Sequence, residues 1–321
     1  MGIEASPTRF RSTDKINKFI YSFRWTPTHG QVRKNMADIH YLDQPLETEA
    51  LLERLCPPVR NWFKDTFPDF TRPQKLAIPA IIDQEHLLLC SPTGSGKTLT
   101  AFLTIIDQLV RRALDGKLDK RVYCVYISPI KALANDIQRN LLGPLKEISE
   151  RYLPDRAQEI KVGLRTGDTP QSERQKMLRN PPHILITTPE SLAIAITSPR
   201  FQPIVSEVEY MIIDELHSLV PTKRGVHLAL TLSYLDTLLT RPVQRIGISA
   251  TMEPLETVAE FLVASDDQES RSAATKVCIA KVSGSRELDL DILITDPKFS
   301  DLSVMKIFDK NIEAIADFIA A

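Results

Sequence analysis

The sequence predicts an α/β fold with a mostly parallel sheet flanked by helices. Between about residues 85 and 250, short apolar runs alternate with amphipathic stretches, which is the pattern of repeated strand and helix units. The short runs are apolar throughout rather than alternating, as expected for strands that are covered on both faces. The longer stretches repeat apolar residues at spacings of three and four, as helices do.

Six strands are expected, and each is a short apolar run: HLLLCS (86–91), RVYCVYIS (121–128), EIKVGL (159–164), HILIT (183–187), YMIID (210–214) and RIGIS (245–249). Between them, helices are expected in TLTAFLTIIDQLVRRAL, ALANDIQRNLL, ESLAIAIT and HLALTLSYLDTLL. Upstream, a helix that starts near Glu47 should break at Pro57 and Pro58, and a second helix should follow. Downstream, the polar stretch 264–275 is expected to be a loop that closes the main domain.

Composition indicates a folded protein with a sizeable core. The chain has 321 residues, of which 43% are hydrophobic, enough for one domain and a small module or extension. It contains no apolar run long enough to span a membrane and no signal-peptide pattern, so the expected location is cytoplasmic, without membrane contact. Four widely separated cysteines without a CxxC pair suggest neither a zinc site nor a disulfide framework.

The N-terminal segment differs in charge from the rest of the chain. The net charge of −1 argues against coating nucleic acid by bulk charge, but residues 1–40 carry seven basic and three acidic side chains. We therefore expect residues 1–44 to be a basic extension. It is either a poorly ordered start or an arm that contacts nucleic-acid phosphates.

The segment SPTGSGKT, residues 91–98, fits a glycine-rich phosphate-binding loop between a predicted strand and a predicted helix. Ser91 stands where such loops usually have their first glycine. Gly94 and Gly96 would let backbone amides turn toward phosphates, Lys97 would reach the outer phosphates, and Thr98 could ligate Mg²⁺. ATP and Mg²⁺ are thus the expected ligands, and the predicted binding residues are Ser91, Pro92, Thr93, Gly94, Ser95, Gly96, Lys97 and Thr98.

The segment MIIDELH, residues 211–217, supplies two carboxylates at the end of an apolar run. Asp214 is placed to hold Mg²⁺ through its water shell, and Glu215 to orient or deprotonate an attacking water. On its own the segment could be a strand end followed by a helix start. Together with the phosphate loop it predicts hydrolysis of the nucleotide, because a protein that only binds nucleotide does not need the second carboxylate.

Several motifs resemble those of superfamily 2 helicases of the DExH type. The DELH tetrapeptide and the SAT at 249–251 resemble motifs II and III, and SPIKALANDI (128–137), TTPESL (187–192) and FTRPQ (70–74) resemble motifs Ia, Ib and Q. The segments RTGDTPQSERQKMLRNPPHILITTPESL, KRGVHLAL and RIGISATMEP are similar to the Lhr group, the large helicase-related proteins. The resemblance covers about residues 65–265 and implies a RecA-like P-loop domain over residues 45–265.

The resemblance implies roles for the matched residues. Gln74 would contact adenine, and coupling of nucleotide to nucleic acid would fall to His217, Ser249 and Thr251. Single-stranded nucleic acid would be held by Pro129, Lys131, Arg165, Gly167, Asp168, Thr188, Pro189 and Ser191. Independently of the resemblance, loops at the carboxyl edge of a parallel sheet converge on one face, where Lys131 and Arg165 could grip phosphates without reading bases.

Each of these residues also has a simpler interpretation. His217 could be an ordinary histidine at a helix start, and Thr188 and Ser191 could only cap the helix that begins at Pro189. Lys131 and Arg165 could be solvated charges. Asp168 could serve only its turn, and Pro129 could only end a strand.

The resemblance further implies a second RecA-like domain that completes the site with arginines. Its motifs are not found after residue 265, where 266–321 read as a loop, the strand TKVCIAKV, and the final helix DKNIEAIADFIAA leading toward that domain. We expect a truncated ATP-dependent helicase, moving 3′ to 5′ on single strands, with DNA favoured over RNA, and largely inactive alone. The alternatives are half of a split motor completed in trans by another chain, and a non-catalytic, nucleotide-dependent nucleic-acid-binding module.

Overall fold

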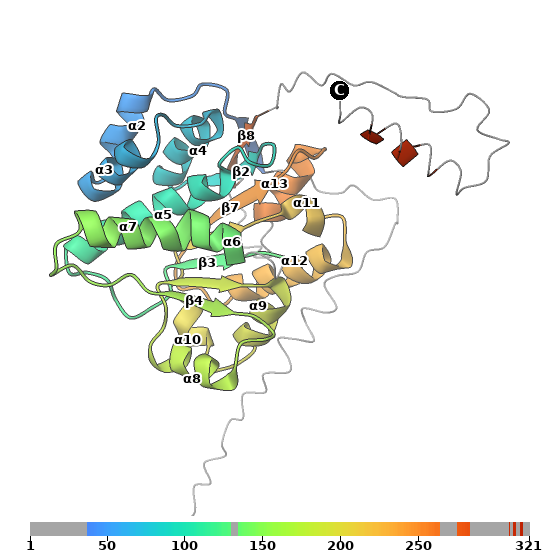
Figure 1. Ribbon diagram of the computed structural model, residues 1–321. Coiled ribbons are helices and arrows are strands. Elements are labelled where there is room, and N and C mark those ends of the chain that lie inside the picture. The colour runs from blue at the N-terminus through green and yellow to red at the C-terminus, as the bar shows by residue number, and fades with distance from the viewer. Residues whose placement is uncertain are drawn as a thin grey trace, which may run out of the picture.

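The computed structural model describes residues 37–129, 134–263 and 275–282, together with five isolated helical positions between 308 and 316. Within these ranges, eight strands form one sheet in the order β1-β8-β2-β7-β6-β3-β5-β4. Every pair of neighbouring strands in this sheet is parallel. The predicted mostly parallel sheet is therefore confirmed (Figure 1).

The strands are four to six residues long, and their bounds are β1 Asp38–Tyr41, β2 His86–Cys90, β3 Cys124–Ile127, β4 Val162–Arg165, β5 Ile184–Thr187, β6 Tyr210–Ile213, β7 Gln244–Ser249 and β8 Lys276–Lys281. The helices are α2 Thr48–Arg54, α3 Pro57–Thr66, α4 Arg72–Ile82, α5 Lys97–Leu114, α6 Ala134–Ile137, the π-helical turn η2 Gln138–Leu142, α7 Gly143–Tyr152, α8 Gln171–Arg179, α9 Pro189–Ile196, α10 Gln202–Val205, α11 Leu216–Leu219, α12 Lys223–Asp236 and α13 Leu255–Val263.

Two apolar layers cover the two faces of the sheet. Successive side chains of a strand point to opposite faces, so Leu87 and Leu89 of β2 join one core cluster, while Leu88 and Cys90 join the other. The first cluster contains side chains of α2, α3, α4, α5 and α7, and the second contains side chains of α9 to α13. This three-layer arrangement, visible in Figure 1, explains why the strand segments are apolar without alternation.

The six strands expected between residues 85 and 250 are all present, shifted at their ends by a few residues. The break at Pro57 is confirmed as well. Helix α2 ends at Arg54, and α3 begins at Pro57 with Cys56 as its N-cap residue. Pro57 is tolerated there because the first turn of a helix has no partner for its amide. All four cysteines are free and buried.

The sheet takes one strand from each side of the predicted domain. The division at residues 44 and 265 stays a prediction, but β1 lies before it and β8 after it. The strand expected in TKVCIAKV is present as β8. It lies between β1 and β2 in this sheet and is buried over its four central residues, while the expectation that 266–321 lead toward a second domain stays a prediction. The apolar core of KVCIAK explains this placement, because such a strand is stable when both faces are covered.

Three expectations fall on residues outside the described ranges. They are the basic segment up to residue 36, the loop over 264–274 and most of the final helix. Among the described residues, no helix is both long and apolar enough to cross a membrane.

Candidate functional site

The predicted motifs lie at one edge of the sheet. Residues 91–98 follow β2, Asp214 and Glu215 follow β6, and Ser249 ends β7. Pro129 and Thr188 follow the neighbouring strands β3 and β5, and Arg165 ends β4. Because all strands are parallel, these ends share the carboxyl edge, where ligands of open α/β sheets bind.

The loop of residues 91–98 is shaped by its glycines. Gly94 and Gly96 have φ angles of +78° and +86°, a region that side chains rarely adopt. A Cβ at position 96 would also lie only 3.1 Å from Nε2 of Gln74. Gly96 is the N-cap of α5, an 18-residue helix, so its amide end faces the loop. Both features suit an anionic ligand, because helix N-termini carry free amides and a positive dipole end.

Lys97 is held inside this loop. Its Nζ donates to the carbonyl oxygens of Ser91 and Pro92, both at 2.7 Å. Burial lowers the pKa of Lys97, and the negative charges of Glu215 and Asp214 oppose that shift. The ammonium group is therefore held by loop carbonyls, and the two carboxylates favour its charged form.

Gln74 fixes the start of α4 beside the loop. Its Oε1 accepts a hydrogen bond from the Thr71 amide at 2.8 Å, and the Thr71 hydroxyl donates to the Ser95 carbonyl at 3.0 Å. Residues 71 and 74 form a capping box, in which the cap and the third helical residue satisfy each other's backbone. The side chain predicted to contact adenine thus lies next to Gly96.

Asp214 is buried, and both of its oxygens are occupied. Oδ1 accepts from the Glu215 amide at 2.8 Å, and Oδ2 accepts from the hydroxyl of Tyr126, on the adjacent strand β3. Burial raises the pKa of Asp214 to about 6, although the bonds from Tyr126 and the Glu215 amide oppose the shift. The orientation of this carboxylate is therefore set by two donors.

Glu215 and His217 connect this strand end to the next. Glu215 adopts a left-handed conformation with φ +55°, which is uncommon for a residue with a side chain. Its Oε2 lies 3.1 Å from Nε2 of His217, while Nδ1 of His217 accepts from the Ala250 amide at 3.2 Å. Ser249 is buried at the end of β7, whereas Thr251 is exposed beyond it. The structure thus brings His217 and the Ser249–Thr251 segment together.

Arg165 is a buried cation that stacks on an aromatic ring. Its guanidinium carbon lies 4.6 Å from the ring centroid of Phe201, and only 9% of the residue is exposed. Within the described part of the chain, no acidic side chain lies within ion-pair distance of it. Burial and the nearby Arg174 lower the pKa of this guanidinium. An unpaired cation in this position is suited to an anionic ligand.

The loop after β4 contains Gly167 and Asp168 and is closed by Arg174. Nε of Arg174 donates to the Thr169 carbonyl at 2.9 Å, and one terminal nitrogen donates to the carbonyls of Thr166 at 3.2 Å and Gly167 at 2.9 Å. The Thr166 amide donates to the Thr169 hydroxyl at 2.8 Å. The loop carbonyls are therefore directed at Arg174.

The remaining predicted contacts have structural partners. Thr188 caps α9, because its hydroxyl oxygen accepts from the Ser191 amide at 3.3 Å, and Pro189 occupies the first turn. The carbonyl of Pro129 accepts from Arg224 at 3.0 Å. Lys131 lies outside the described residues. Capping of α9 is confirmed for Thr188, whereas Ser191 supplies the amide that is capped, and this arrangement is compatible with a ligand at the same helix end.

Tyr126, Arg174 and Phe201 are among the neighbours of the site that were not predicted. Tyr126 lies in an apolar strand and reads as a core residue, and Phe201 reads in the same way. Arg174 belongs to a polar helix with many charges, where one basic residue does not stand out. None of them carries a signal in a single sequence, because their roles depend on contacts between separate elements.

The donors suit ATP with Mg²⁺. Among the described residues, no group of three His, Cys, Asp or Glu side chains could hold a metal ion by itself. Magnesium usually needs no such group, because it is bound by one or two carboxylates, substrate phosphates and water. The hydroxyl of Thr98 and the carboxylate of Asp214 offer the hard oxygens that it prefers, and the open space at Gly94 leaves room for phosphates.

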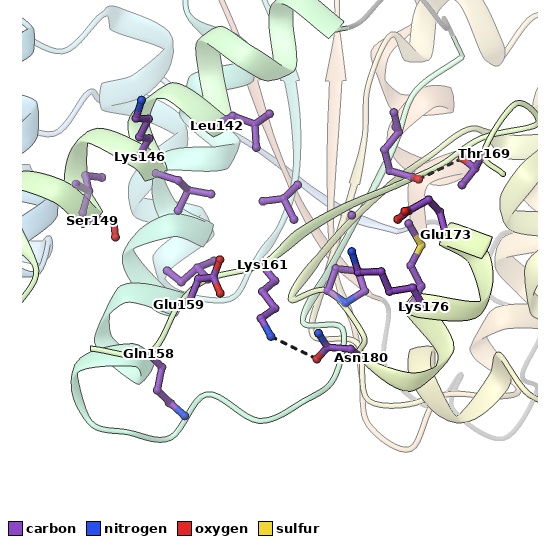
Figure 2. A pocket seen from close by; sticks show the side chains of 18 of the residues that line it. Leu142, Lys146, Ser149, Gln158, Glu159, Lys161, Thr169, Glu173, Lys176 and Asn180 are labelled. Carbon is purple, nitrogen blue, oxygen red and sulfur yellow. Dashed lines mark hydrogen bonds between the residues drawn. The ribbon is translucent and has the colours of Figure 1, made fainter. Parts of the chain in front are cut away.

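A separate hollow of about 1030 Å³ lies along β4, between α7 and α8. Figure 2 shows Lys161 and Lys176 in it beside Asn180, and Nζ of Lys161 lies 3.4 Å from Oδ1 of Asn180. No residue of the loop 91–98 lines it. It meets the predicted site only at the loop after β4, through Thr166, Asp168 and Thr169.

A parallel sheet with a glycine-rich loop leading into a helix, and an acidic pair at a nearby strand end, defines a P-loop domain. The chain belongs to the DEAD/DEAH box helicase family, whose model matches residues 71–261. It is 49% identical over 230 residues to the ATP-dependent helicase Lhr-Core of Methanocaldococcus jannaschii. That match covers 71% of this chain and 27% of the relative, so the chain spans about a quarter of its length.

Solved structures agree with this assignment. The helicase Lhr of Mycobacterium smegmatis, bound to ssDNA and AMP-PNP, matches with a TM-score of 0.69 and 40% identity over 84% of this chain and 33% of that one. The DEAD-box helicase Mss116, bound to ssRNA and UDP-BeF, has a TM-score of 0.60 at 19% identity over 76% of this chain and 47% of that one, which shows the fold alone. The RecA-like fold and the resemblance to Lhr-type helicases are confirmed.

Proposed function

We propose that this chain is the ATP-binding motor domain of an Lhr-like, ATP-dependent DNA helicase, in which hydrolysis drives movement along a single strand from 3′ to 5′. The observation that carries the proposal is that Lys97, Asp214 and Arg165 all lie along the carboxyl edge of one parallel sheet. The names of the similar proteins support it, since they are called ATP-dependent helicases and one was solved with ssDNA and AMP-PNP. That complex also favours DNA over RNA as the strand.

In the nucleotide half of the site, the loop amides and Lys97 would bind the phosphates of ATP, and Gln74 would meet the adenine. Lys97 would exchange its two carbonyl partners for phosphate oxygens, which are stronger acceptors for an ammonium group. Thr98 and Asp214 would hold Mg²⁺, which neutralises charge on the phosphates. Each Asp214 oxygen accepts one hydrogen bond and keeps a further lone pair, which could accept from a water molecule bound to the metal.

Glu215 would orient the attacking water and accept its proton. Its contact with His217, and that of His217 with the Ala250 amide, would carry a change at the phosphates to the Ser249–Thr251 segment. In the nucleic-acid-binding part of the site, the sugar-phosphate backbone of the bound single strand would lie over Pro129, Lys131, Arg165, Gly167, Asp168, Thr188, Pro189 and Ser191. These groups would contact phosphates rather than bases and would bind without strong sequence preference.

Arginines from a second RecA-like domain would complete the site, supplied in the same polypeptide or in trans by another chain. Such an arginine contributes about 10³- to 10⁵-fold to turnover in related phosphoryl-transfer proteins. Residues 1–321 on their own should therefore bind ATP and hydrolyse it slowly. Mixing them with a polypeptide that carries the second domain should raise the rate.

The proposal is tested with the 321-residue chain. A fluorescent, non-hydrolysable ATP analogue should bind in the presence of Mg²⁺, and Lys97→Ala should lose this binding. Glu215→Gln should retain it while slowing single-turnover hydrolysis by roughly 10²- to 10⁴-fold. Lys64→Ala, which removes an exposed lysine from α3, serves as the control and should change neither. If the wild-type chain binds no nucleotide with Mg²⁺, the proposal is wrong.

A further inference from the structure

Arg224, in the first turn of α12, contacts two loops at the carboxyl edge of the sheet. Its Nε donates to Oε1 of Glu190 at 2.7 Å, and a terminal nitrogen donates to the carbonyl of Pro129 at 3.0 Å. Glu190 lies in the first turn of α9, directly after β5, and Pro129 follows β3. The strands β3 and β5 are hydrogen-bonded neighbours. The side chain of Arg224 thus connects the ends of two adjacent β-strands. In the proposed function, a nucleic-acid single strand binds at these two ends.

The backbone that carries Arg224 is itself fixed. At the next residue, Gly225, an added Cβ would lie 2.4 Å from the carbonyl oxygen of Leu219, at the end of α11. The hydroxyl of Thr222 donates to the same oxygen at 2.8 Å. The first turn of α12 therefore packs tightly against α11, which begins one residue after Glu215. Arg224 is placed by this packing as well as by its own two hydrogen bonds.

The contacts of Arg224 disfavour two simpler roles. Its side chain is 44% exposed and that of Glu190 is 49% exposed, so the ion pair alone would contribute little to stability. Arg224 also donates to the main-chain carbonyl of Pro129, however, and a simple surface ion pair would not require this second hydrogen bond. Direct contact with a phosphate is the other role. Two of the three guanidinium nitrogens already have protein acceptors, which favours a role within the protein.

We propose that Arg224 is a positioning residue for single-strand binding: it holds the Pro129 carbonyl and the N-terminus of α9 at the spacing that lets both loops contact the same strand. This inference rests on the proposed function, because it assumes that these loops bind nucleic acid. Arg224 acts through Glu190 and Pro129 and makes no contact with the nucleotide.

The test measures binding of fluorescein-labelled oligothymidine to the 321-residue chain by anisotropy at low salt. Arg224→Ala should weaken binding by roughly 3- to 10-fold, the effect of removing one member of a small hydrogen-bonded network. Affinity for the fluorescent ATP analogue should stay within about two-fold of wild type, since the loop 91–98 is not touched. Arg224→Lys should be intermediate, because one ammonium group cannot reproduce a two-directional guanidinium contact.

Glu190→Gln separates positioning from direct contact. If Arg224 positions α9 through this carboxylate, the substitution should weaken strand binding in the same direction as Arg224→Ala. If Arg224 instead touches phosphate, removing a negative charge and freeing the guanidinium should strengthen binding, and that result would overturn the proposal. A double variant no weaker than Arg224→Ala alone would support action through one shared contact.

Arg241→Ala is the matched control. Arg241 has a 45% exposed side chain and pairs with Glu207 and Glu209, away from the carboxyl edge, so its removal should leave strand binding unchanged. If Arg224→Ala binds oligothymidine with the affinity of the wild-type chain, the positioning role is refuted while the proposed function stays intact. Failure of the wild-type chain to bind any oligothymidine would instead refute the nucleic-acid half of the proposed function.

Discussion

Tyr126 donates its phenolic hydrogen to Oδ2 of Asp214, so the carboxylate at the end of β6 is oriented by a side chain from the neighbouring strand β3. Tyr126 is fully buried, and its ring lies 4.9 Å from that of Phe102 on α5. The tyrosine is therefore rigid, and so is the acceptor that it holds. The carboxylate predicted to serve Mg²⁺ is set in place by protein contacts.

Tyr126→Phe keeps the ring and removes this bond. Without it, Asp214 should be free to rotate and its charged form should be less favoured, because the bond from Tyr126 lowers the pKa of Asp214. We expect the Mg²⁺ concentration that half-saturates binding of the ATP analogue to rise by about 3- to 10-fold, the effect of losing a hydrogen bond to a charged group. Tyr123→Phe alters another buried tyrosine, whose hydroxyl accepts from the Asp119 amide, and should not change this concentration.

Asp214→Asn should stabilise the chain at alkaline pH. Burial raises the pKa of Asp214 from 3.8 to about 6, so the folded protein binds this proton more tightly than the unfolded chain does. The buried charge therefore costs stability fully above pH 6, and the cost fades as the pH falls toward 4. At pH 8 the variant should be more stable by on the order of 1 to 3 kcal/mol, and at pH 5 by about half as much.

Urea unfolding at the two pH values measures this difference. An advantage of Asp214→Asn that is equal at pH 5 and pH 8 would contradict the assignment of the raised pKa to this residue.

Arg174→Gln should loosen the loop after β4. The substitution removes three hydrogen bonds to loop carbonyls, and glutamine is too short to restore them all. We expect faster hydrogen exchange at residues 166–169 and a loss of oligothymidine affinity of roughly 3- to 10-fold. Arg179→Gln, an exposed arginine on the same helix, is the control for charge. Equal losses in the two variants would mean that charge alone matters.

Gly225→Ala should destabilise the domain. A Cβ there would lie 2.4 Å from the Leu219 carbonyl oxygen and 2.9 Å from its carbon, both backbone atoms that cannot move aside cheaply. Overpacking of this kind typically costs about 1 to 3 kcal/mol. Gly167→Ala meets nothing within 4 Å and should be nearly neutral in the same urea titration. A similar stability for both variants would contradict the close packing of α11 and α12.

The fold was predictable where apolar pattern decides structure. Strands such as β2 and β6 are continuous apolar runs, and burial on both faces leaves them no other favourable state. The strand β1 was missed because DIHY is short, polar and mostly exposed, and only pairing with β8 defines it. The apolar strand β8 was recognised as a strand, but its position in the order of the sheet depends on long-range pairing that periodicity does not encode.

The candidate site divides in a similar way. Lys97, Asp214 and Glu215 could be predicted because phosphate and water chemistry demand these residue types at fixed distances from a strand end. Tyr126 and Arg224 were not, because a buried tyrosine and an exposed arginine are common and acquire a role only from neighbours far along the chain. Sequence reasoning thus reaches the residues of the proposed chemistry before the residues that position them.

The place of β8 in the sheet has a consequence for synthesis on the ribosome. Among the described residues, β1 pairs with β8 alone, so it has no partner in this sheet until more than two hundred later residues have emerged. Pairing over such a separation is slow, because the intervening loop must close first. The amide of Val282 then donates to the carbonyl of Cys90, directly before the phosphate loop. The strand β8 thus completes the pairing of β2, and the segment that leads into the phosphate loop gains this support only after β8 has been translated.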